Sequence, residues 1–408
     1  MVYLEKIKNC PVCSSKKIYS LFNLKSIPLA DNFSKKRVKT KKDTLLPINP
    51  HICNNCTHVF LKHFVNQNHN YKNNFSYKTQ VTKGLQTHFM SEIKKIITEN
   101  KIKKGSFCVD IGSNDGTILS ILKKNKLKFV GIEPSISIAK YANQKGLKTI
   151  NSFFNEKVVK KIIKKSKKPA MVLSTYTFAN IKNLKKFLKT VSNLIASNGI
   201  FVIETGYHPK QMENNMFDYF YHEHFSYFSL RSIKYLLNSF GFKILKVKVT
   251  EPKSGSLLIV SKKCKFNKLQ VSNTEKKILF SEKRKGVYTK DFYLKFMKKI
   301  NFYKTKLHKK LDNIKKNGQK IIGYGASHSS TLLLHQFDLK KYLDFIVDDN
   351  VIKHNTFSPN HKIPVFSPST MYKKKILNVL ILAWNKKKYI IQKHKKFINK
   401  SGNFILPF

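Results

Sequence analysis

Arginine is nearly absent from this chain, which has only Arg37, Arg231 and Arg284 among its 79 basic residues. With 22 acidic residues the formal net charge is +57, a value that normally suggests a nucleic-acid binder. Readers of base edges and phosphates rely on the bidentate contacts of arginine, however, and the lysines here are spread over the whole sequence. The composition therefore favours a solvated lysine surface, which would still attract an anionic nucleotide.

Long apolar runs are also missing. No stretch approaches the ~18 apolar residues of a membrane span, and the start, Met1 to Lys6, lacks the apolar core of a signal peptide. We therefore expect a cytoplasmic protein with no membrane partner. Its 408 residues, 41% of them hydrophobic, suffice for two or three domains that each bury a core, while the oligomeric state is not indicated.

Cysteine is scarce, and four of the six cysteines fall in two C-x-x-C pairs near the N-terminus. Each pair can place two thiolates on one tight turn. Two such turns make a tetrahedral four-thiolate site that is closed to water and therefore structural. The sequence predicts one Zn²⁺ that is held by Cys10, Cys13, Cys53 and Cys56.

Glycine is scarce too, and two glycines stand in the pattern D-x-G-x-x-x-G that follows the apolar run 107–111. A second apolar run, 128–132, ends in Glu133. Glycine lets the backbone turn sharply, a helix start offers unpaired N–H groups, and an acidic residue at the second strand end can bind ribose hydroxyls. The pattern predicts a nucleoside cofactor on a doubly wound sheet; the alternative is an ordinary turn with chance glycines.

The acidic residue beside the turn narrows the choice of cofactor. A dinucleotide site would show G-x-G-x-x-G, and Asp110 would repel a pyrophosphate. S-adenosylmethionine (SAM) suits it better, because its amino and sulfonium groups are both positive. The turn and Glu133 resemble motifs I and II of class I methyltransferases. We expect SAM to contact Asp110, Gly112, Ser113, Asn114, Gly116 and Glu133.

Strand and helix patterns alternate from residue 105 to about 262, which predicts a mostly parallel α/β sheet with ligands at the strand C-terminal ends. Strands are expected at 107–111, 128–132, 147–150, 170–174, 199–204, 243–249 and 255–261. Phe153, after the third strand, could border an adenine, and Thr175, after the fourth, could face the amino-acid end of the cofactor. Either residue could instead belong to the core.

An aromatic block, defined as residues 217–230, has the most unusual composition in the chain. It contains His222, Glu223 and His224 in succession among aromatic residues. Such surroundings move pKa values toward neutrality, which suits a general base. Structural hydrogen bonding is a second interpretation. Metal binding is a third, although positions i and i+2 give only two ligands and no further ligand is evident.

The last third of the chain begins with a lysine-rich helical connector and then starts a new α/β pattern. Residues 320–325 form a strand that ends in G-x-G, and further strands are expected at 343–350, 379–384 and 403–406. The helix start behind the G-x-G turn predicts an anion site that could hold a nucleotide diphosphate. The alternative is a degenerate copy of the first unit that only packs.

Together, the cysteine pairs, the glycine turn, the run 131–135 and the aromatic block resemble the sugar C-methyltransferase family over nearly the whole chain. The resemblance implies an α/β protein with a class I methyltransferase Rossmann-like sheet. It also implies a small zinc-binding domain before this sheet and a second Rossmann-like domain after it. The expected limits are 1–66 for the zinc-binding domain, 67–265 for the SAM-dependent methyltransferase domain, 266–318 for the helical connector and 319–408 for the C-terminal domain.

The resemblance also implies catalytic roles. The family's proposed base would be His224 here, with Tyr221 and Glu223 beside it, and Tyr77 is similar to an active-site tyrosine of the family.

The chain departs from the family pattern at two points. Residues 327–330, Ser-His-Ser-Ser, stand where the family often has Ala-Lys-Gly, and Asn180 stands where it often has histidine. These departures leave the exact substrate open.

The sequence thus predicts a SAM-dependent C-methyltransferase that methylates a carbon next to the ketone of a nucleotide-linked 4-keto-6-deoxy sugar. In this hypothesis His224, oriented by Glu223, removes the proton, and Tyr221 or Tyr77 donates to the enolate oxygen. The alternative is a zinc-knuckle nucleic-acid-binding or RNA-methylating protein, whose binding would depend steeply on salt. A non-catalytic binder of sugar nucleotides is a third hypothesis.

Overall fold

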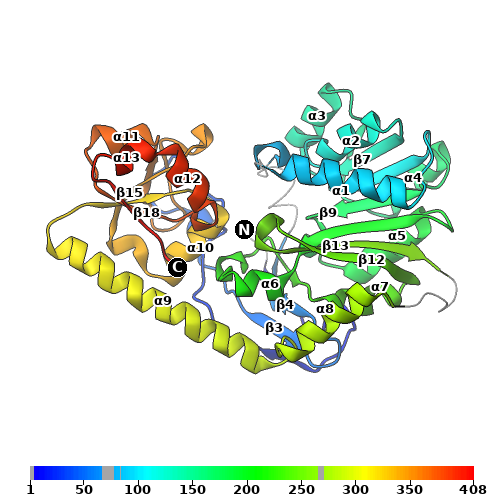
Figure 1. Cartoon of the computed structure of the whole chain (residues 1–408), viewed down its shortest axis with the longest axis horizontal. Helices are drawn as coiled ribbons and strands as arrows, with labels where there is room; N and C mark the ends of the chain where they lie inside the picture. Colours follow the sequence, from blue (N-terminus) through cyan, green and yellow to red (C-terminus); the bar gives the residue numbers. More distant parts are fainter. Residues whose placement is uncertain (1–3, 67–77, 83, 265–270) are drawn as a thin grey trace.

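Three sheet-containing modules and one long helix make up the computed structural model, which describes residues 4–66, 78–82, 84–264 and 271–408. Figure 1 shows the C-terminal module at the left and the middle module at the right, with helix α9 along the lower edge. Within the described ranges, no helix is both long enough and apolar enough to cross a membrane.

The N-terminal module is built from short antiparallel strands. Strands β1 (Leu4–Lys6) and β5 (His63–Val65) pair with each other. A second sheet has the order β11-β4-β3-β2, formed by β2 (Ile18–Ser20), β3 (Pro50–Cys53), β4 (Val59–Leu61) and β11 (Ser226–Tyr227). Because β11 belongs to the aromatic block, that block adds a strand to a sheet that begins 200 residues earlier, which the sequence did not predict.

The middle module is a seven-stranded sheet of order β12-β13-β10-β9-β6-β7-β8. Its strands are β6 (Phe107–Ile111), β7 (Lys128–Glu133), β8 (Thr149–Asn151), β9 (Met171–Thr175), β10 (Ile200–Gly206), β12 (Phe242–Thr250) and β13 (Ser256–Lys263). The first five run parallel, and β13 lies antiparallel between β10 and β12. This is the strand order of a class I methyltransferase, as the sequence predicted.

Helices cover both faces of this sheet, which explains why its central strands are mostly apolar and buried. Strand β9, for example, is buried from Met171 to Ser174. The helices are α1 (Leu85–Glu99), α2 (Thr117–Lys124), α3 (Ile136–Gln144), α4 (Glu156–Lys165), α5 (Leu184–Leu194), α6 (His208–Glu213) and α7 (Leu230–Asn238). The strand C-terminal ends therefore meet at one edge, where a ligand is expected.

The C-terminal module follows α8 (Asn273–Arg284) and α9 (Lys290–Lys316) and is a second Rossmann-like sheet of order β16-β17-β15-β14-β18-β19. Its strands are β14 (Ile321–Tyr324), β15 (Leu343–Val347), β16 (Thr356–Phe357), β17 (Pro364–Phe366), β18 (Asn378–Ile381) and β19 (Asn403–Ile405). All pair in parallel except β16. Its helices are α10 (His328–Gln336), α11 (Ser369–Lys373), α12 (Lys387–Lys393) and α13 (Lys395–Ile398). The sequence missed β16 and β17, which are two and three residues long.

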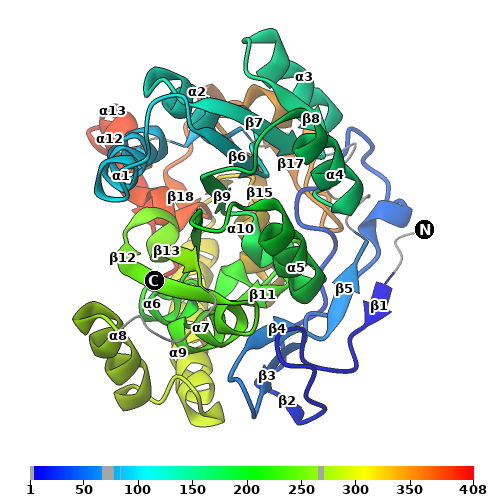
Figure 2. The ribbon, with the colours of Figure 1, turned by 90° about the vertical axis from the view of Figure 1, so that its right-hand side faces the viewer.

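One hydrophobic core joins the modules, and the aromatic block lies inside it. This core includes Leu21 of the N-terminal module, Phe220 of the block, Tyr293 of α9 and Leu333 of α10. The block is also tied to the C-terminal module by a hydrogen bond from the indole Nε1 of Trp384 to Asp218, at 2.8 Å. Figure 2 shows α10 and β11 near the centre of the molecule, behind the middle sheet.

Candidate active site

The four predicted metal ligands come together in the N-terminal module. The Sγ atoms of Cys10, Cys13, Cys53 and Cys56 all lie within 4.8 Å of one another. Cys10 and Cys56 are 3.5 Å apart, and Cys13 and Cys53 are 3.4 Å apart. A tetrahedron with Zn–S bonds of about 2.3 Å has edges of about 3.8 Å, so this cluster fits one Zn²⁺ with no open position. The hydrogen bond from the Cys56 thiol lowers the pKa of Cys10 to about 6.

A cavity of about 230 Å³ opens at the C-terminal ends of β6, β7 and β9. Predicted cofactor-binding residues that line it are Asp110, Gly112, Ser113, Asn114, Glu133, Phe153 and Thr175. Gly116 lies behind the cavity instead, where a Cβ atom would come within 2.5 Å of the Leu147 side chain. Its φ of 79° places it in the left-handed region just before α2, so its function is to start the helix.

The backbone at Gly112 is shaped for a close approach. Its φ is 75°, and an added Cβ would lie 2.0 Å from Oγ1 of Thr177, another residue of the cavity wall. A side chain at position 112 would therefore both strain the backbone and fill the space in front of the turn.

Asp110 is the acidic side chain beside the turn, and it lies at the wall of the cavity. Its side chain is buried, and its Oδ1 has no hydrogen-bond partner in the described part of the chain. Burial, together with the nearby Glu133 carboxylate, raises the pKa of Asp110 to about 8. A buried carboxyl without a partner, at the wall of a cavity, fits a cationic ligand, because a cation would offset the cost of ionising it.

Glu133 ends β7 and braces the turn. Its Oε2 accepts the N–H of Asn114 at 3.0 Å, and its Oε1 accepts the N–H of Ser135 at 2.8 Å. Burial raises its pKa to about 7. Each carboxylate oxygen retains a second lone pair, so Glu133 is placed to accept hydroxyls of a ribose in the cavity.

The structure also brings residues to this cavity that sequence reasoning missed. They are contributed by α1 (Phe89), by the segment after β9 (Thr177) and by the turn between β12 and β13 (Lys253). Tyr176, which ends the run 174–176 that the sequence placed at the amino-acid end of the cofactor, also lines the cavity. Tyr176 and Lys253 have φ values of 51° and 56°. Left-handed backbone at residues other than glycine clusters at functional sites, but a single sequence gives no signal for it.

His224 is half-buried among tyrosines of the aromatic block. Its Nδ1 is 3.3 Å from the carbonyl oxygen of Tyr219, and its Nε2 is 3.3 Å from the hydroxyl of Tyr221. The carbonyl oxygen can only accept, so Nδ1 carries the proton and Nε2 presents its lone pair. Burial lowers the pKa of His224 to about 3. The ring is therefore neutral at pH 7, rather than near half-protonation as the sequence suggested.

Glu223 does not contact the His224 ring as the sequence led us to expect, because the carbonyl of Tyr219 orients that ring. The Glu223 side chain points instead to the C-terminal module, where its Oε1 lies 3.8 Å from Nε2 of His328. Burial raises the pKa of Glu223. His222 faces the opposite way, toward the carbonyls of Pro47 and Leu46 in the N-terminal module.

The segment that carries His224 adjoins the cavity. The N–H of Phe225 bonds to the carbonyl of Ala179 at 3.0 Å, and the next residue, Asn180, lines the cavity. The positive charge of Lys253, another lining residue, also reaches His224 and contributes to its lowered pKa. The segment that carries the candidate base is therefore hydrogen-bonded to the segment that lines the cavity, although Tyr221, Glu223 and His224 are not themselves among the lining residues.

Two further predictions concern Tyr77 and a metal at the aromatic block. Tyr77 lies outside the described residues. Among the described side chains, the only group of three or more potential metal ligands is the cysteine cluster. His222 faces Pro47 and Leu46 of the N-terminal module, whereas His224 contacts Tyr219 and Tyr221 of its own block, and the described coordinates thus give the metal interpretation no support.

The second glycine turn, in the C-terminal module, is less open than the sequence suggested. The N–H of Gly325 bonds to the carbonyl of Val347, and the carboxylate of Asp348 accepts the N–H of Ala326. At the helix start, Oγ of Ser327 accepts the N–H of Ser330. An acidic side chain at the turn disfavours a diphosphate at that position.

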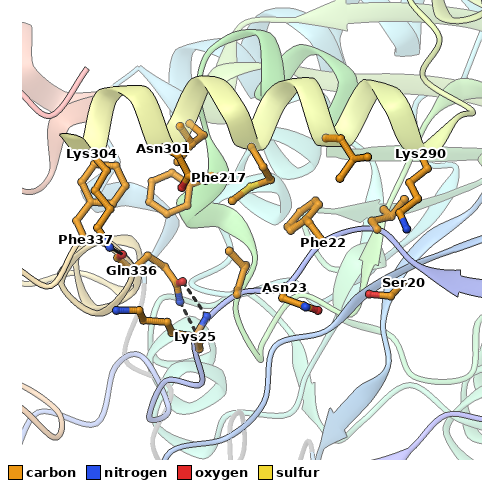
Figure 3. A pocket seen from close by; sticks show the side chains of 15 residues that line it. Ser20, Phe22, Asn23, Lys25, Phe217, Lys290, Asn301, Lys304, Gln336 and Phe337 are labelled. Atoms are coloured by element: carbon orange, nitrogen blue, oxygen red, sulfur yellow. Dashed lines mark hydrogen bonds between the residues drawn. The ribbon is translucent and has the colours of Figure 1, made fainter. Parts of the chain in front are cut away.

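A larger cavity of about 580 Å³ lies beneath α9, beside the loop 20–25 (Figure 3). None of the predicted site residues lines it. Two of its lysines, Lys25 and Lys304, both contact the carboxylate of Asp338. We therefore place the chemistry at the smaller cavity.

Three family models match the chain in succession. A zinc binding domain matches residues 10–71, a methyltransferase domain matches residues 84–247, and a C-methyltransferase C-terminal domain matches residues 252–408.

A curated relative spans nearly the same length. C-methyltransferase NovU of Streptomyces niveus is 26% identical over 402 residues, which cover 98% of this chain and 95% of that protein.

Solved structures resemble the chain over less of its length. Magnesium protoporphyrin IX methyltransferase of Synechocystis with bound SAM is 12% identical, with a TM-score of 0.33 over 44% of this chain and 79% of that one. A SAM-dependent methyltransferase of Clostridium acetobutylicum is 16% identical, with a TM-score of 0.36 over 43% and 91%.

Proposed function

We propose a specific reaction for this chain, which belongs to the three-domain C-methyltransferase family and is a SAM-dependent methyltransferase with a structural Zn²⁺ site. The reaction is transfer of the methyl group of SAM to a carbon next to the ketone of a nucleotide-linked keto sugar. A 4-keto-6-deoxy sugar is the substrate that the resemblance of the sequence implies. The proposal rests above all on the neutral, half-buried imidazole of His224, whose segment is hydrogen-bonded to the segment 179–180 beside the cofactor cavity.

His224 suits proton abstraction from carbon. The Tyr219 carbonyl fixes the ring through Nδ1, so that the lone pair of Nε2 is available without a prior loss of a proton. A ketone acidifies its neighbouring C–H, and the proton that leaves this carbon moves to Nε2. Burial disfavours the imidazolium that results, but the enolate charge forms nearby in the same step and offsets that cost.

Tyr221 is placed to assist. Its hydroxyl lies 3.3 Å from Nε2 of His224, and the two rings are 4.3 Å apart. In the reaction the hydroxyl would turn to the substrate ketone and donate to the oxygen as this oxygen gains negative charge.

SAM supplies an electrophilic methyl group when it is bound. The chain's own contribution is to hold the two carbons close and dry. Asp110 would face the positive groups of the cofactor and Glu133 would accept from its ribose, while Phe153 and Thr175 line the same cavity. The methyl group would pass to the substrate carbon, S-adenosylhomocysteine would be left, and His224 would then release the proton that it took.

Nucleic-acid binding or RNA methylation, the alternative from the sequence, gains no support from the matched domains. The matched relative is a C-methyltransferase. A protein that only binds sugar nucleotides would have no use for a buried carboxyl group, that of Asp110, at the wall of a cofactor cavity.

The test is incubation in heavy water with a panel of nucleotide-linked keto sugars. We expect deuterium to enter beside the ketone when S-adenosylhomocysteine replaces SAM, and a methyl group to enter there when SAM is present. His224→Ala should abolish both, by at least about 10²-fold, without weakening SAM binding.

His51→Ala is the matched control, because the Nδ1 of His51 also faces a backbone carbonyl, that of Asn49, but in the N-terminal sheet. This variant should retain activity. Methylation of oxygen or nitrogen, or loss of SAM binding in His224→Ala, would contradict the proposed reaction.

A further inference from the structure

We infer that His328 of the C-terminal module is a positioning residue of the active site that fixes the carboxylate of Glu223. This inference rests on the proposed function, and no family match or sequence expectation assigned His328 a role. His328 is the first residue of α10 and stands directly behind the second glycine turn.

The geometry places His328 between two carboxylates from two other modules. Its Nε2 lies 3.8 Å from Oε1 of Glu223, and its Nδ1 lies 4.0 Å from Oδ1 of Asp31. Its ring is also 5.5 Å from the ring of Tyr221, at an angle of 34°. The His328 imidazole thus faces two acids, Asp31 and Glu223, and lies next to Tyr221, the candidate proton donor. It thereby connects all three modules.

The backbone that presents His328 is held firmly. Ser327 caps α10 through the N–H of Ser330 at 3.2 Å. One turn further, the hydroxyl of Thr331 donates to the carbonyl of Ala30 at 2.7 Å. Since Asp31 follows Ala30, the helix and the loop that carries Asp31 are fixed to each other, and so is the spacing between His328 and its acidic neighbours.

Charge explains why Glu223 needs this neighbour. The side chain of Glu223 is only 12% exposed, and burying a carboxylate is costly unless a positive or donating group lies nearby. His328 favours the ionised form of Glu223, whereas Asp31 opposes it. Lys353 contacts Asp31 at 2.6 Å and offsets part of that repulsion.

The distances of 3.8 and 4.0 Å exceed those of direct hydrogen bonds. His328 therefore acts on the two acids as an ion-pair neighbour and not as a direct hydrogen-bond donor. His328 thereby links the C-terminal module to the side chain of Glu223 in the aromatic block.

The test follows the ionisation of Glu223 without any substrate. Infrared titration of the SAM-bound protein would monitor its carboxyl band, which Glu223→Gln identifies. We expect His328→Gln to raise the pKa of Glu223 by about one unit, because a favourable neighbour is lost, and His328→Lys to lower it. Ser329→Ala, on the next residue of the same helix, should leave it unchanged.

The kinetic arm uses the same variants. We expect His328→Gln to slow both deuterium incorporation and methyl transfer about tenfold, to move the acidic limb of the pH–rate profile upward, and to leave the KM for SAM unchanged. In His328→Lys the acidic limb of the pH–rate profile should return to the wild-type pH or below it. Intact SAM binding shows that each variant is folded.

The outcomes separate the inference from the proposed function. If neither His328 variant moves the pKa of Glu223 and both keep rates within twofold of the wild type, the inference is overturned. If the pKa moves as expected but the wild-type protein exchanges no proton of any keto sugar, the positioning of Glu223 is supported and the proposed reaction fails.

Discussion

Two strand–glycine turn–helix units occur in this chain, and they differ in what lies in front of the turn. In each unit an acidic residue at the end of the second strand accepts an N–H of the turn. Glu133 accepts from Asn114 in the middle module, and Asp348 accepts from Ala326 in the C-terminal module. The turn glycines, Gly112 and Gly325, both have positive φ.

The difference begins two residues before each turn glycine. Asp110 occupies that position in the middle module and faces a cavity. Gly323 occupies it in the C-terminal module, where an added Cβ would meet Leu382 at 2.6 Å. Gly325 is likewise closed off by Ala383, 2.5 Å from its added Cβ. The local motif therefore builds the turn, whereas a buried carboxylate and an open space decide whether it holds a cationic cofactor.

The largest expected effect comes from filling each turn with a methyl group. Gly112→Ala should weaken SAM binding by about 10²-fold or more, because its φ of 75° is strained for alanine and the methyl group meets Thr177. Gly325→Ala should lower the free energy of unfolding by about 1–3 kcal/mol but leave SAM affinity intact. Calorimetric titration measures the SAM affinity of both variants, and urea titration measures the free energy of unfolding of Gly325→Ala. An equal loss of SAM affinity in the two variants would contradict the difference between the two turns.

The second effect isolates the carboxylate. Asp110→Asn should reduce SAM affinity about 10- to 100-fold, the range expected for loss of a hydrogen bond to a charged group. The matched variant is Asp348→Asn, which removes the corresponding charge from the other module and should not change SAM affinity. A comparable loss from Asp348→Asn would mean that the C-terminal turn also takes part in cofactor binding.

The third effect is a pH dependence of SAM affinity. The pKa of Asp110 is about 8 in the free protein because the group is buried, and a cationic ligand favours its ionised form. Affinity should therefore rise with pH up to about 8, by at most about tenfold per unit, with release of a proton. In Asp110→Asn the slope should be reduced to what Glu133 contributes. A slope of opposite sign would show that no carboxyl ionises on binding.

The raised pKa of Asp110 also makes the stability of the ligand-free protein depend on pH. The folded pKa of Asp110 is raised above that of the unfolded chain, so the native state favours the protonated form. Without ligand, this residue's contribution to the free energy of unfolding should decrease as pH rises from about 4 to about 8. Urea titrations of the wild type and of Asp110→Asn across this range would measure the difference.

The smallest effect concerns the helix starts. Helix α10 is capped by the Ser327 side chain, whereas α2 begins at Gly116 without a side-chain cap. Ser327→Ala should cost about 1 kcal/mol of stability, and Gly116→Ser should gain nothing because φ is 79° and the Leu147 side chain is in the way. Thermal melts of both variants would measure these changes in stability. A loss above about 3 kcal/mol in Ser327→Ala would indicate that Ser327 does more than cap α10.

Much of the fold could be predicted because its signals are local. The apolar runs predicted all seven strands of the middle sheet within about two residues, as for β6 at Phe107–Ile111, and four of the six strands of the C-terminal sheet. Strands β11, β16 and β17 were missed because strands of two or three residues are defined by their partners and have no pattern of their own. The limits of the four predicted domains stay predictions.

The sequence predicted the part of the candidate site that one continuous segment forms. It did not predict the contacts between side chains of different modules. The glycine turn and Glu133 belong to one unit of contiguous sequence, and they do line one cavity. The partner of Glu223 proved to be His328, more than 100 residues away, and a neighbour in the next module leaves no trace in sequence spacing. The same holds for Lys253, whose turn reaches the cavity from a distant strand pair.

The most direct test of the account is a crystal structure of the protein with SAM, since the central claim is that the methyl donor and the His224 imidazole face a common space. We expect the cofactor to fill the 230 Å³ cavity, with its amino end at Asp110 and its ribose at Glu133. Its methyl group should point toward Nε2 of His224, with room for one sugar ring between them. A methyl group directed away from that imidazole, or no gap between them, would contradict the account.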